Sequence, residues 1–320
     1  MRVSGVLKSS KSSTNTTLVG VVSLTGLLVN AAMPHLDELA PLPQHRYVPE
    51  TYEQYTAAVY VLWNLLDGII HQQMRGKTKP YIPLGYMRKV QLRAYSKMAW
   101  KRPDVRTYCE TGVNGGHGTA AMLLANPSLV AHSFDPGEQP YSDGVFQALK
   151  WYFGERIVLH RGDSHRLLPA FLGDSTRGLC DVILVDGDHS EHGAYKDIVD
   201  FHPLAACNAN VLLDDVMESA RRFNANGGPQ RALARAESDG KLRVIERHVY
   251  NVTGPDNPCL RSKDNPRITH CINPWGWAVA RYNNHGRDCH ISDDAGPTRL
   301  GAAGGGLLSG RRGAGNSAQP

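Results

Sequence analysis

Residues 105–118, VRTYCETGVNGGHG, are the stretch of sequence that decides the fold. A short run of β-forming residues, Val105–Cys109, leads into an acid and then a glycine-rich turn, and a helical pattern follows at Thr119–Ala125. Glycines let the backbone approach a ligand closely, and the first turn of a helix offers N–H groups without a partner in the helix. The spacing therefore predicts a ligand-binding turn at the end of a buried strand.

The glycine spacing is acid-x-Gly-x-x-x-Gly-x-Gly, which differs from the pattern of nicotinamide-binding proteins. That pattern places Gly-x-Gly-x-x-Gly directly after the strand. The nearest fit is Gly116-x-Gly118-x-x-Ala121, which begins six residues after Glu110. A nicotinamide oxidoreductase is therefore the least favoured of the enzyme classes.

Working outward from this turn, strand-like and helical stretches alternate. Four more β runs are expected at Val130–Phe134, Ile157–His160, Val182–Val185 and Val211–Leu213. Helical patterns lie between them at Gly144–Phe153, Ser164–Leu172 and Glu191–Ala206, and another lies near Ser219–Glu237. This alternation predicts a doubly wound α/β fold with a parallel sheet. The last two β runs, Leu242–Tyr250 and Trp275–Tyr282, have no helical pattern between them and should form an antiparallel hairpin.

The segments outside this α/β body have different compositions. Helices are expected at Tyr52–Met74 and Lys89–Trp100, so residues 34–100 form an N-terminal helical extension to a domain at 101–291. Residues 292–320 are rich in glycine and are expected to be a disordered tail. The apolar run Leu18–Val29 and the sequence Val29-Asn30-Ala31, with small residues at positions −3 and −1 of a signal-peptidase site, make residues 1–33 resemble a secretory signal or anchor. An organelle transit peptide or an unstructured tail is the alternative.

Composition and charge exclude several classes of protein. The chain has 320 residues, 41% of them hydrophobic, and this content is too high for a disordered chain. No apolar run reaches the ~18–20 residues of a spanning helix, which excludes a multi-span membrane protein. Six of the basic residues lie in the two ends, so the formal charge of +5 becomes −1 for residues 34–297. A body this close to neutral gives no electrostatic reason to expect nucleic-acid binding, and membrane contact is expected only through an N-terminal anchor.

Acidic residues follow each of the later strands. Asp135 ends the second strand, where a carboxylate can accept both hydroxyl hydrogens of a ribose. Asp163 follows the third, where it would face an adenine amine, although Ser164 beside it would equally serve as a helix cap. Asp186 follows the fourth strand, and Asp214 and Asp215 follow the fifth. Three carboxylates at two adjacent strand ends repel one another unless a cation or protons intervene, and Mg²⁺ suits such oxygen-rich clusters.

Taken in order, these motifs resemble a family. Glu-x-Gly-x-x-x-Gly-x-Gly, the strand-two Asp, Gly-Asp-Ser, Val-Asp-Gly-Asp-His and Leu-Leu-Asp-Asp are similar to the class I S-adenosylmethionine-dependent methyltransferases. The Asp-Gly-Asp-His-Ser phrase resembles the small-molecule O-methyltransferases of the catechol and caffeoyl-CoA type. The resemblance covers about residues 80–285 and implies a seven-stranded, mostly parallel, Rossmann-like sheet that ends in a hairpin.

The resemblance also implies roles for individual residues. Glu110, Gly112, Gly116 and Gly118 would surround the methionine and ribose of S-adenosylmethionine, Asp135 would bind the ribose hydroxyls, and Asp163 the adenine region. Asp186, Asp214 and Asp215 would hold Mg²⁺, although the family has Asn where one of the paired aspartates stands here. His189 stands where those enzymes have a catalytic Lys, and it would accept the proton of a substrate hydroxyl. The alternative is that His189 begins the next helix and supports the site without contacting the substrate. Asp188 would orient His189 or cap the next helix, and capping is favoured.

The six cysteines divide into two groups. Cys109, Cys180 and Cys207 lie in or beside apolar segments and are expected to be buried and inert. Cys259 and Cys271 bracket the loop between the hairpin strands, and a disulfide between them is expected if the chain enters an oxidising lumen. The sequon Asn251-Val252-Thr253 lies nearby. These features and the N-terminus favour the secretory pathway, either free or anchored in the lumen, over an organelle or the cytoplasm.

The sequence therefore predicts a Mg²⁺-assisted O-methyltransferase for a small hydroxylated molecule or a sugar. A metal-independent methyltransferase is the alternative within the enzymes. A non-catalytic module that binds S-adenosylmethionine or a nucleotide is the alternative from another class. The intact glycine turn and acid cluster argue against that module.

Overall fold

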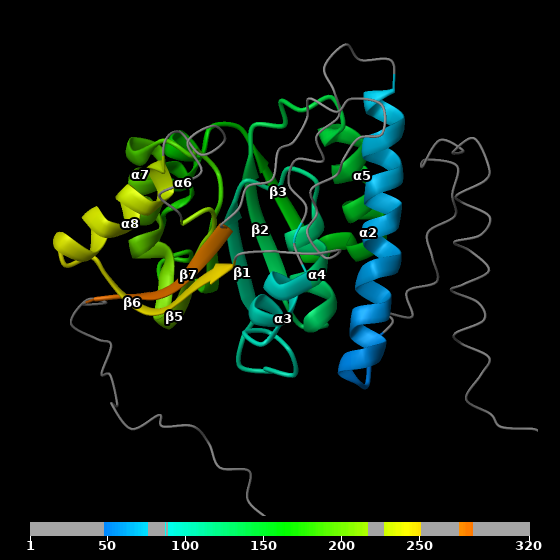
Figure 1. The fold of residues 1–320 in the computed structure, drawn as a ribbon, viewed down its shortest axis with the longest axis horizontal. Coiled ribbons are helices and arrows are strands. Elements are labelled where there is room, and N and C mark those ends of the chain that lie inside the picture. Colours follow the sequence, from blue (N-terminus) through cyan, green and yellow to red (C-terminus); the bar gives the residue numbers. More distant parts are fainter. Residues whose placement is uncertain (1–47, 76–86, 88, 217–226, 251–274, 284–320) are drawn as a thin grey trace, which may run out of the picture. The chain divides into compact units, whose positions relative to one another are not determined.

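The computed structural model describes residues 48–75, 87, 89–216, 227–250 and 275–283, and their centre is a seven-stranded sheet (Figure 1). The strand order is β3-β2-β1-β4-β5-β7-β6. Strands β1 to β5 pair in parallel, whereas β7 is antiparallel to both β5 and β6. The expected doubly wound sheet with a C-terminal antiparallel hairpin is confirmed.

The strands and helices lie close to where the sequence places them. The strands are β1 (Thr107–Thr111), β2 (Val130–Asp135), β3 (Ile157–Arg161), β4 (Cys180–Val185), β5 (Ala205–Leu213), β6 (Leu242–Tyr250) and β7 (Trp275–Tyr282). The helices are α2 (Tyr52–Met74), α3 (Lys89–Ser96), α4 (His117–Ala125), α5 (Ser142–Phe153), α6 (Ser164–Phe171), α7 (Glu191–Phe201) and α8 (Gly228–Ser238). Two short 3₁₀ turns, Gly154–Arg156 and His202–Leu204, precede β3 and β5.

Helices cover both faces of the sheet. Helices α2, α4 and α5 lie on one face, and α6, α7 and α8 on the other (Figure 1). Side chains alternate between these layers: Tyr108 of β1 joins the first core, whereas Cys109 joins the second. All five residues of β1 are buried, as expected for the central strand of a sheet covered on both faces.

The N-terminal extension is part of the first core. Helix α2 begins with a capping box, in which Thr51 accepts from the N–H of Gln54 and Gln54 accepts from the N–H of Thr51. Its apolar stripe, from Tyr55 to Ile70, is buried, and the Tyr55 hydroxyl donates to the carbonyl of Ala121 in α4 at 3.0 Å. The helix that follows the glycine turn is therefore held from outside by α2.

The boundaries of β5 and α7 differ from the sequence prediction. The strand begins at Ala205 instead of Val211, and the helix ends at Phe201. A 3₁₀ turn with Pro203 at its start ends the helix. Asn208 has a positive φ of 64°, and the polar residues around it hide the strand from a pattern based on apolar residues.

The prediction that the first three cysteines are inert is wrong. Cys109 and Cys180 are fully buried, as expected, but they form a disulfide between β1 and β4 with a Cα–Cα distance of 5.8 Å. Cys207 is exposed and is also disulfide-bonded. The apolar character of the neighbouring residues predicted burial correctly for two cysteines, but it carried no information about pairing.

Several predictions fall on residues outside the described ranges. These are the apolar segment Leu18–Val29, the loop that contains Cys259 and Cys271, and the glycine-rich tail. Among the described helices, none combines the length and the apolar composition that crossing a membrane requires.

Candidate functional site

The carboxyl ends of the parallel strands bring the predicted loops together. Each strand end is extended by one more backbone bond: Gly112 N–H donates to Phe134, Asp186 N–H to Thr111, and Asp214 N–H to Val185. The strand order reverses direction between β1 and β4, and ligands of open α/β sheets bind at such a point. The sheet register therefore fixes where the glycine turn and the acid-bearing loops begin.

Two glycines of the turn have no room for a side chain. Gly112 has a φ of 83°, and a Cβ there would lie 2.0 Å from the carbonyl oxygen of Asp186. Gly116, the N-cap of α4, has a φ of 77°, and its Cβ would lie 2.9 Å from Val145 and Leu149 side-chain atoms. Gly118 differs, because a Cβ there would make ordinary contact with Met87 at 3.6 Å. The first glycine thus lets the turn after β1 lie directly against the loop after β4.

Glu110 is enclosed by hydroxyl groups. Its side chain is 1% exposed, and Oε1 accepts from the hydroxyls of Thr119 at 2.5 Å and Ser133 at 2.6 Å. Oε2 accepts from the Tyr108 hydroxyl at 2.9 Å. Burial raises the pKa of Glu110 to about 7, although the three hydroxyls act in the opposite direction. Glu110 therefore ties β1, β2 and α4 together beneath the glycine turn.

Asp135 supports the turn and is placed to meet a ligand. Its Oδ2 accepts from the N–H of Asn114 at 3.0 Å, and its Oδ1 accepts from the N–H of Gly137 at 2.7 Å. Asn114 has a φ of 47°, and its Oδ1 accepts from the Tyr141 hydroxyl at 2.5 Å. Each carboxylate oxygen accepts one backbone hydrogen and keeps lone-pair capacity for hydroxyl groups.

Asp163, and not Ser164, caps α6. Its Oδ1 accepts from the N–H of His165 at 3.0 Å, and its side chain is 54% exposed. Ser164 instead donates to Asp197 of α7 at 2.8 Å. The capping contact leaves much of the Asp163 side chain exposed at the carboxyl end of β3.

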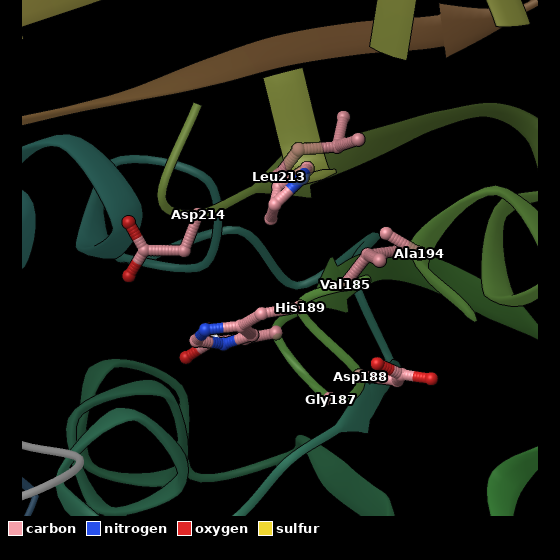
Figure 2. A pocket seen from close by; sticks show the side chains of 9 residues that line it. Val185, Gly187, Asp188, His189, Ala194, Leu213 and Asp214 are labelled. Carbon is pink, nitrogen blue, oxygen red and sulfur yellow. Dashed lines mark hydrogen bonds and ion pairs between the residues drawn. The ribbon is translucent and has the colours of Figure 1, made fainter. Parts of the chain in front are cut away.

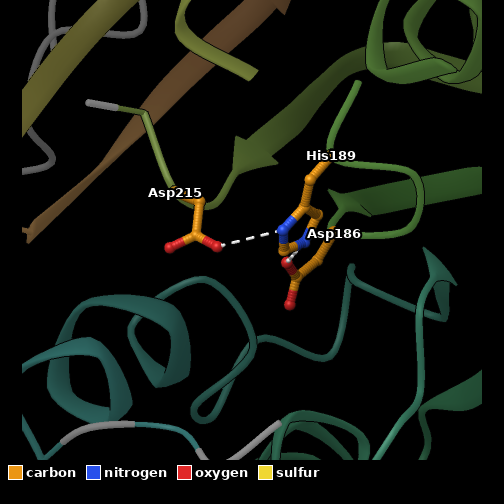
Figure 3. Close-up of side chains that lie close together, drawn as sticks. All are labelled: Asp186, His189 and Asp215. Carbon is orange, nitrogen blue, oxygen red and sulfur yellow. Dashed lines mark hydrogen bonds and ion pairs between the residues drawn. The ribbon is translucent and has the colours of Figure 1, made fainter. Parts of the chain in front are cut away.

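The loops after β4 and β5 bring together two carboxylates and an imidazole (Figure 3). His189 Nε2 lies 3.2 Å from Asp186 Oδ1, and His189 Nδ1 lies 3.4 Å from Asp215 Oδ2. One ligand atom from each of these residues lies within 4.8 Å of the other two, which suits a single cation. Asp215 has a φ of 53°, and the N–H of Val216 beyond it bonds to the carbonyl of Gly276 in β7.

Asp214 lies outside this group. Its Oδ2 accepts from Gln91 Nε2 of α3 at 2.7 Å, and its Oδ1 accepts from the N–H of Asp215 at 2.8 Å. Burial raises the pKa of Asp214 well above its usual value, and the charges of Asp186 and Asp215 raise it further. Of the three predicted metal ligands, the structure thus places two beside His189 and directs the third toward Gln91.

The electrostatics favour a positive charge between the carboxylates. Burial disfavours a charged ring, but the hydrogen bond to Asp186 and the charges of Asp186, Asp215 and Asp214 raise the pKa of His189 to about 10. A pocket lies beside it, lined by Val185, Asp186, Gly187, Asp188, His189, Ala194, Leu213, Asp214 and Pro229 (Figure 2).

Asp188 does not orient His189. Its carboxylate points away from the imidazole ring in Figure 2, and Oδ1 accepts from the N–H of Ser190 at 2.8 Å. Ser190 itself is the N-cap of α7, and its hydroxyl accepts from the N–H of Gly193. Asp188 therefore supports the turn into α7 but is not the cap residue.

Three contributors to the site were missed from the sequence. Gln91 holds Asp214, Asn114 links the glycine turn to Asp135, and Asp197 accepts from Ser164. The Asn within a glycine-rich turn was a usable signal, because Asn adopts positive φ more readily than most residues. Asp197 also had a signal, since it shares a helical face with Ala194, Ile198 and Phe201.

Both proposed ligands fit these residues. The two glycines leave the turn after β1 clear of side chains, and Asp135 keeps acceptor capacity beside it, as a nucleoside ligand requires. The carboxylates of Asp186 and Asp215 have ligand atoms within 4.8 Å of each other, which suits a divalent cation, and the imidazole of His189 lies beside both.

Comparisons with known proteins agree with this description. Residues 109–216 match the family model described as a methyltransferase domain. Comparison with curated protein sequences gives no match.

Solved structures with a similar fold include O-methyltransferases. TomG from Streptomyces achromogenes, in complex with S-adenosylmethionine, is 14% identical over 72% of this chain and 98% of its own, with a TM-score of 0.49. An O-methyltransferase of Bacillus cereus, in complex with S-adenosylhomocysteine, is 13% identical over 73% of this chain and 100% of its own, with a TM-score of 0.48.

Proposed function

We propose that this chain, whose residues 109–216 match the model of a methyltransferase domain, is an S-adenosylmethionine-dependent enzyme that methylates a hydroxyl group of a small molecule or sugar with the help of a divalent cation. The observation that carries the proposal is the cluster of Asp186, His189 and Asp215 directly beside the glycine turn. The closeness of this cluster to the turn supports a role for His189 as proton acceptor and for the two aspartates as cation ligands. The substrate class itself is a proposal from the chemistry of this cluster.

The donor side of the site binds and orients. We assign Gly112, Gly116 and Gly118 to the surroundings of the methionine and ribose, with Glu110 beneath them as support. Asp135 accepts from the ribose hydroxyls, and Asp163 lies toward the adenine. Because the methyl group of a sulfonium is already activated, the protein's main task here is alignment with the acceptor oxygen.

The acceptor side removes the proton of the substrate hydroxyl. A cation such as Mg²⁺ supplies charge that lowers the pKa of a substrate hydroxyl, and Asp186 and Asp215 would hold it, with Asp214 within reach of the same loop. His189 accepts the hydroxyl proton only when its ring is neutral. The two carboxylates keep the pKa of His189 near 10, so positive charge placed on them lowers that pKa toward neutrality. Cation binding at Asp186 and Asp215 would therefore favour the neutral form of His189 that can accept the proton.

One observation favours metal-independent methyl transfer as the second candidate. The imidazole ring already lies between the two carboxylates and contacts both (Figure 3). A protonated His189 therefore supplies positive charge at that point without a metal. In this second mechanism the cluster orients the substrate hydroxyl, and the hydroxyl proton would pass to the Asp186 or Asp215 carboxylate as the oxygen takes the methyl group.

Calorimetry separates these candidates. S-adenosylhomocysteine is titrated into the full chain with and without Mg²⁺, and Mg²⁺ is titrated directly, in the parent and in Asp186→Ala, Asp214→Ala and Asp215→Ala. Asp188→Ala is the matched control, because its carboxylate lies in the same loop and points away from the cluster. We expect Mg²⁺ binding to be lost in Asp186→Ala and Asp215→Ala and retained in Asp188→Ala.

The outcomes have distinct meanings. Binding of S-adenosylhomocysteine without Mg²⁺ binding, even in a ternary mixture with catechol as a model hydroxylated ligand, supports the metal-independent mechanism. A folded chain that does not bind S-adenosylhomocysteine at all contradicts methyl transfer and restores the non-catalytic module.

We also propose that the chain works in an oxidising compartment of the secretory pathway. The disulfide between Cys109 and Cys180 supports this, and so does the bonded state of Cys207. Disulfides persist in such compartments and are rare in the cytosol. Chain isolated from its native cells, denatured and treated with a maleimide reagent should show no labelling at Cys109 and Cys180 until a reductant is added. Labelling of both without reductant would contradict this location.

A further inference from the structure

A buried acid outside the assigned site lies among three of its loops. Asp197 is on α7 and is 0% exposed, on the same face as the apolar Ala194, Ile198 and Phe201. Acids are almost never fully buried unless they are paired or hydrogen-bonded. The contacts of this carboxylate therefore need an account.

One oxygen of Asp197 holds the loop after β3. Oδ1 accepts from the Ser164 hydroxyl at 2.8 Å and lies 3.4 Å from His165 Nε2. The same His165 nitrogen lies 3.2 Å from the carbonyl oxygen of Gly193. Because a carbonyl only accepts, the proton of His165 lies on Nε2 in this contact. Ser164 and His165 directly follow Asp163, so this oxygen fixes the start of α6.

The other oxygen of Asp197 faces the loops after β1 and β4. A Cβ placed on Gly187 would lie 3.1 Å from Asp197 Oδ2 and 3.1 Å from Thr111 Oγ1. The carboxylate and the hydroxyl thus occupy the space beside Gly187 where a side chain would otherwise stand. Gly187 follows Asp186, and Thr111 precedes Gly112. Burial raises the pKa of Asp197 to about 6, whereas the Ser164 hydroxyl and the nearby His165 lower it. Among the described residues, Oδ2 has no hydrogen-bond partner, so it meets the loops after β1 and β4 by packing.

We propose that Asp197 is a positioning residue that ties the loops after β1, β3 and β4 into one unit. It touches neither of the proposed ligands. Its carboxylate sets the relative positions of the adenine-side loop at Asp163 and the loop that carries Asp186 and His189. The assignment of these loops to donor and acceptor binding rests on the proposed function. The contacts of Asp197 with the loops exist in the protein without any ligand.

Two substitutions at this position should behave differently. In Asp197→Asn, the amide oxygen still accepts from Ser164, and the amide nitrogen can donate to Thr111 Oγ1. Asp197→Leu has a similar volume but leaves the half-buried hydroxyl of Ser164 without this acceptor. The Asn variant should therefore retain the link, and the Leu variant should lose it.

Hydrogen exchange of the apo protein tests the link directly. We expect Asp197→Leu to raise the amide exchange rate at least about tenfold in residues 111–116, 162–166 and 186–190 together, and Asp197→Asn to change it less than about threefold. Asp200→Leu is the matched control, since it removes from the same helix a carboxylate that pairs with Lys196. Asp200→Leu should leave the three loops unchanged.

A second variant covers the case in which Asp197→Leu does not fold. Ser164→Ala removes one contact of the carboxylate from the loop after β3, and it should still raise exchange at residues 186–190 on the other side of Asp197. S-adenosylhomocysteine binding should weaken about tenfold in Asp197→Leu and recover in Asp197→Asn. The proposal is overturned if exchange in 186–190 is unchanged in Ser164→Ala, or if Asp197→Leu folds and raises exchange evenly over the whole domain. Neither readout of exchange depends on methyl transfer.

Discussion

The two halves of the site hold their acids in different ways. On the β1–β2 side, Glu110 accepts from three hydroxyls and Asp135 from two backbone N–H groups. On the β4–β5 side, Asp186 and Asp215 share the single imidazole of His189. The first half is completed by hydrogen bonds within the fold, whereas the second depends on a positive charge. The difference indicates that the β1–β2 half, the proposed donor half, is preorganised, and that the β4–β5 half, the proposed acceptor half, would respond to a proton or a cation.

Gly112→Ala should have the largest effect on stability, because it perturbs both halves of the site at once. An alanine there adopts a left-handed conformation and places Cβ 2.0 Å from the Asp186 carbonyl oxygen. Conformational cost and overpacking together should lower the free energy of unfolding by about 3 kcal/mol or more. Gly240→Ala is the control, since φ there is 66° but nothing lies within 4 Å of the new Cβ. Chemical denaturation should show a cost of only about 1 kcal/mol for that control, and equal losses in the two variants would contradict the close approach.

Glu110→Gln tests whether the donor half is indifferent to charge. The folded pKa of Glu110 is raised from 4.5 to about 7, so protonated Glu110 favours the folded state. Its stabilisation is complete below pH 4.5 and is lost as the pH rises through 7, by up to about 3 kcal/mol. Denaturant unfolding at several pH values should show this loss in the parent and a flatter profile in Glu110→Gln. Identical profiles for both proteins would mean that Glu110 does not titrate in this range.

The sequence predicted more of the β1–β2 half of the site than of the β4–β5 half. The turn residues and Asp135 were predicted, because strand-end position and glycine spacing are local signals. The orientation of Asp214 was not predicted, since it depends on Gln91, more than a hundred residues away in the chain. The pairing of Cys109 with Cys180 was missed for the same reason, as it depends on the register of β1 and β4. Local patterns predict which strand end a residue occupies, but contacts between distant segments decide where its side chain points.

Asp215→Asn and Asp214→Asn sharpen the description of the acceptor half. Removing the Asp215 charge, which lies 3.4 Å from His189, should lower the pKa of His189 by about 1 unit or more. Asp214→Asn should lower it less, because the Asp214 carboxylate faces Gln91 and its charge is suppressed by a raised pKa. Nuclear magnetic resonance titration of the His189 ring measures both shifts without added metal. A larger shift in Asp214→Asn would show that the two aspartates exchange roles in solution.

Asp143→Ala should have the smallest effect. It tests whether the exposed Arg161–Asp143 pair supports the turn at Asp135. Arg161 Nη1 bonds to Asp143 Oδ1 at 2.6 Å, and the same guanidinium donates to the carbonyl of Gly137, whose N–H holds Asp135. The side chains of the ion pair are 53% and 70% exposed, so solvent and salt screen their attraction. Loss of this pair should change the free energy of unfolding by less than about 0.5 kcal/mol, with S-adenosylhomocysteine affinity within about twofold of the parent. Measuring the variant at low and high salt decides the point, because a loss above 1 kcal/mol that persists at high salt would make this pair a structural support of the Asp135 turn. The donor half would then depend on charge as well, and the contrast with the acceptor half would be one of degree.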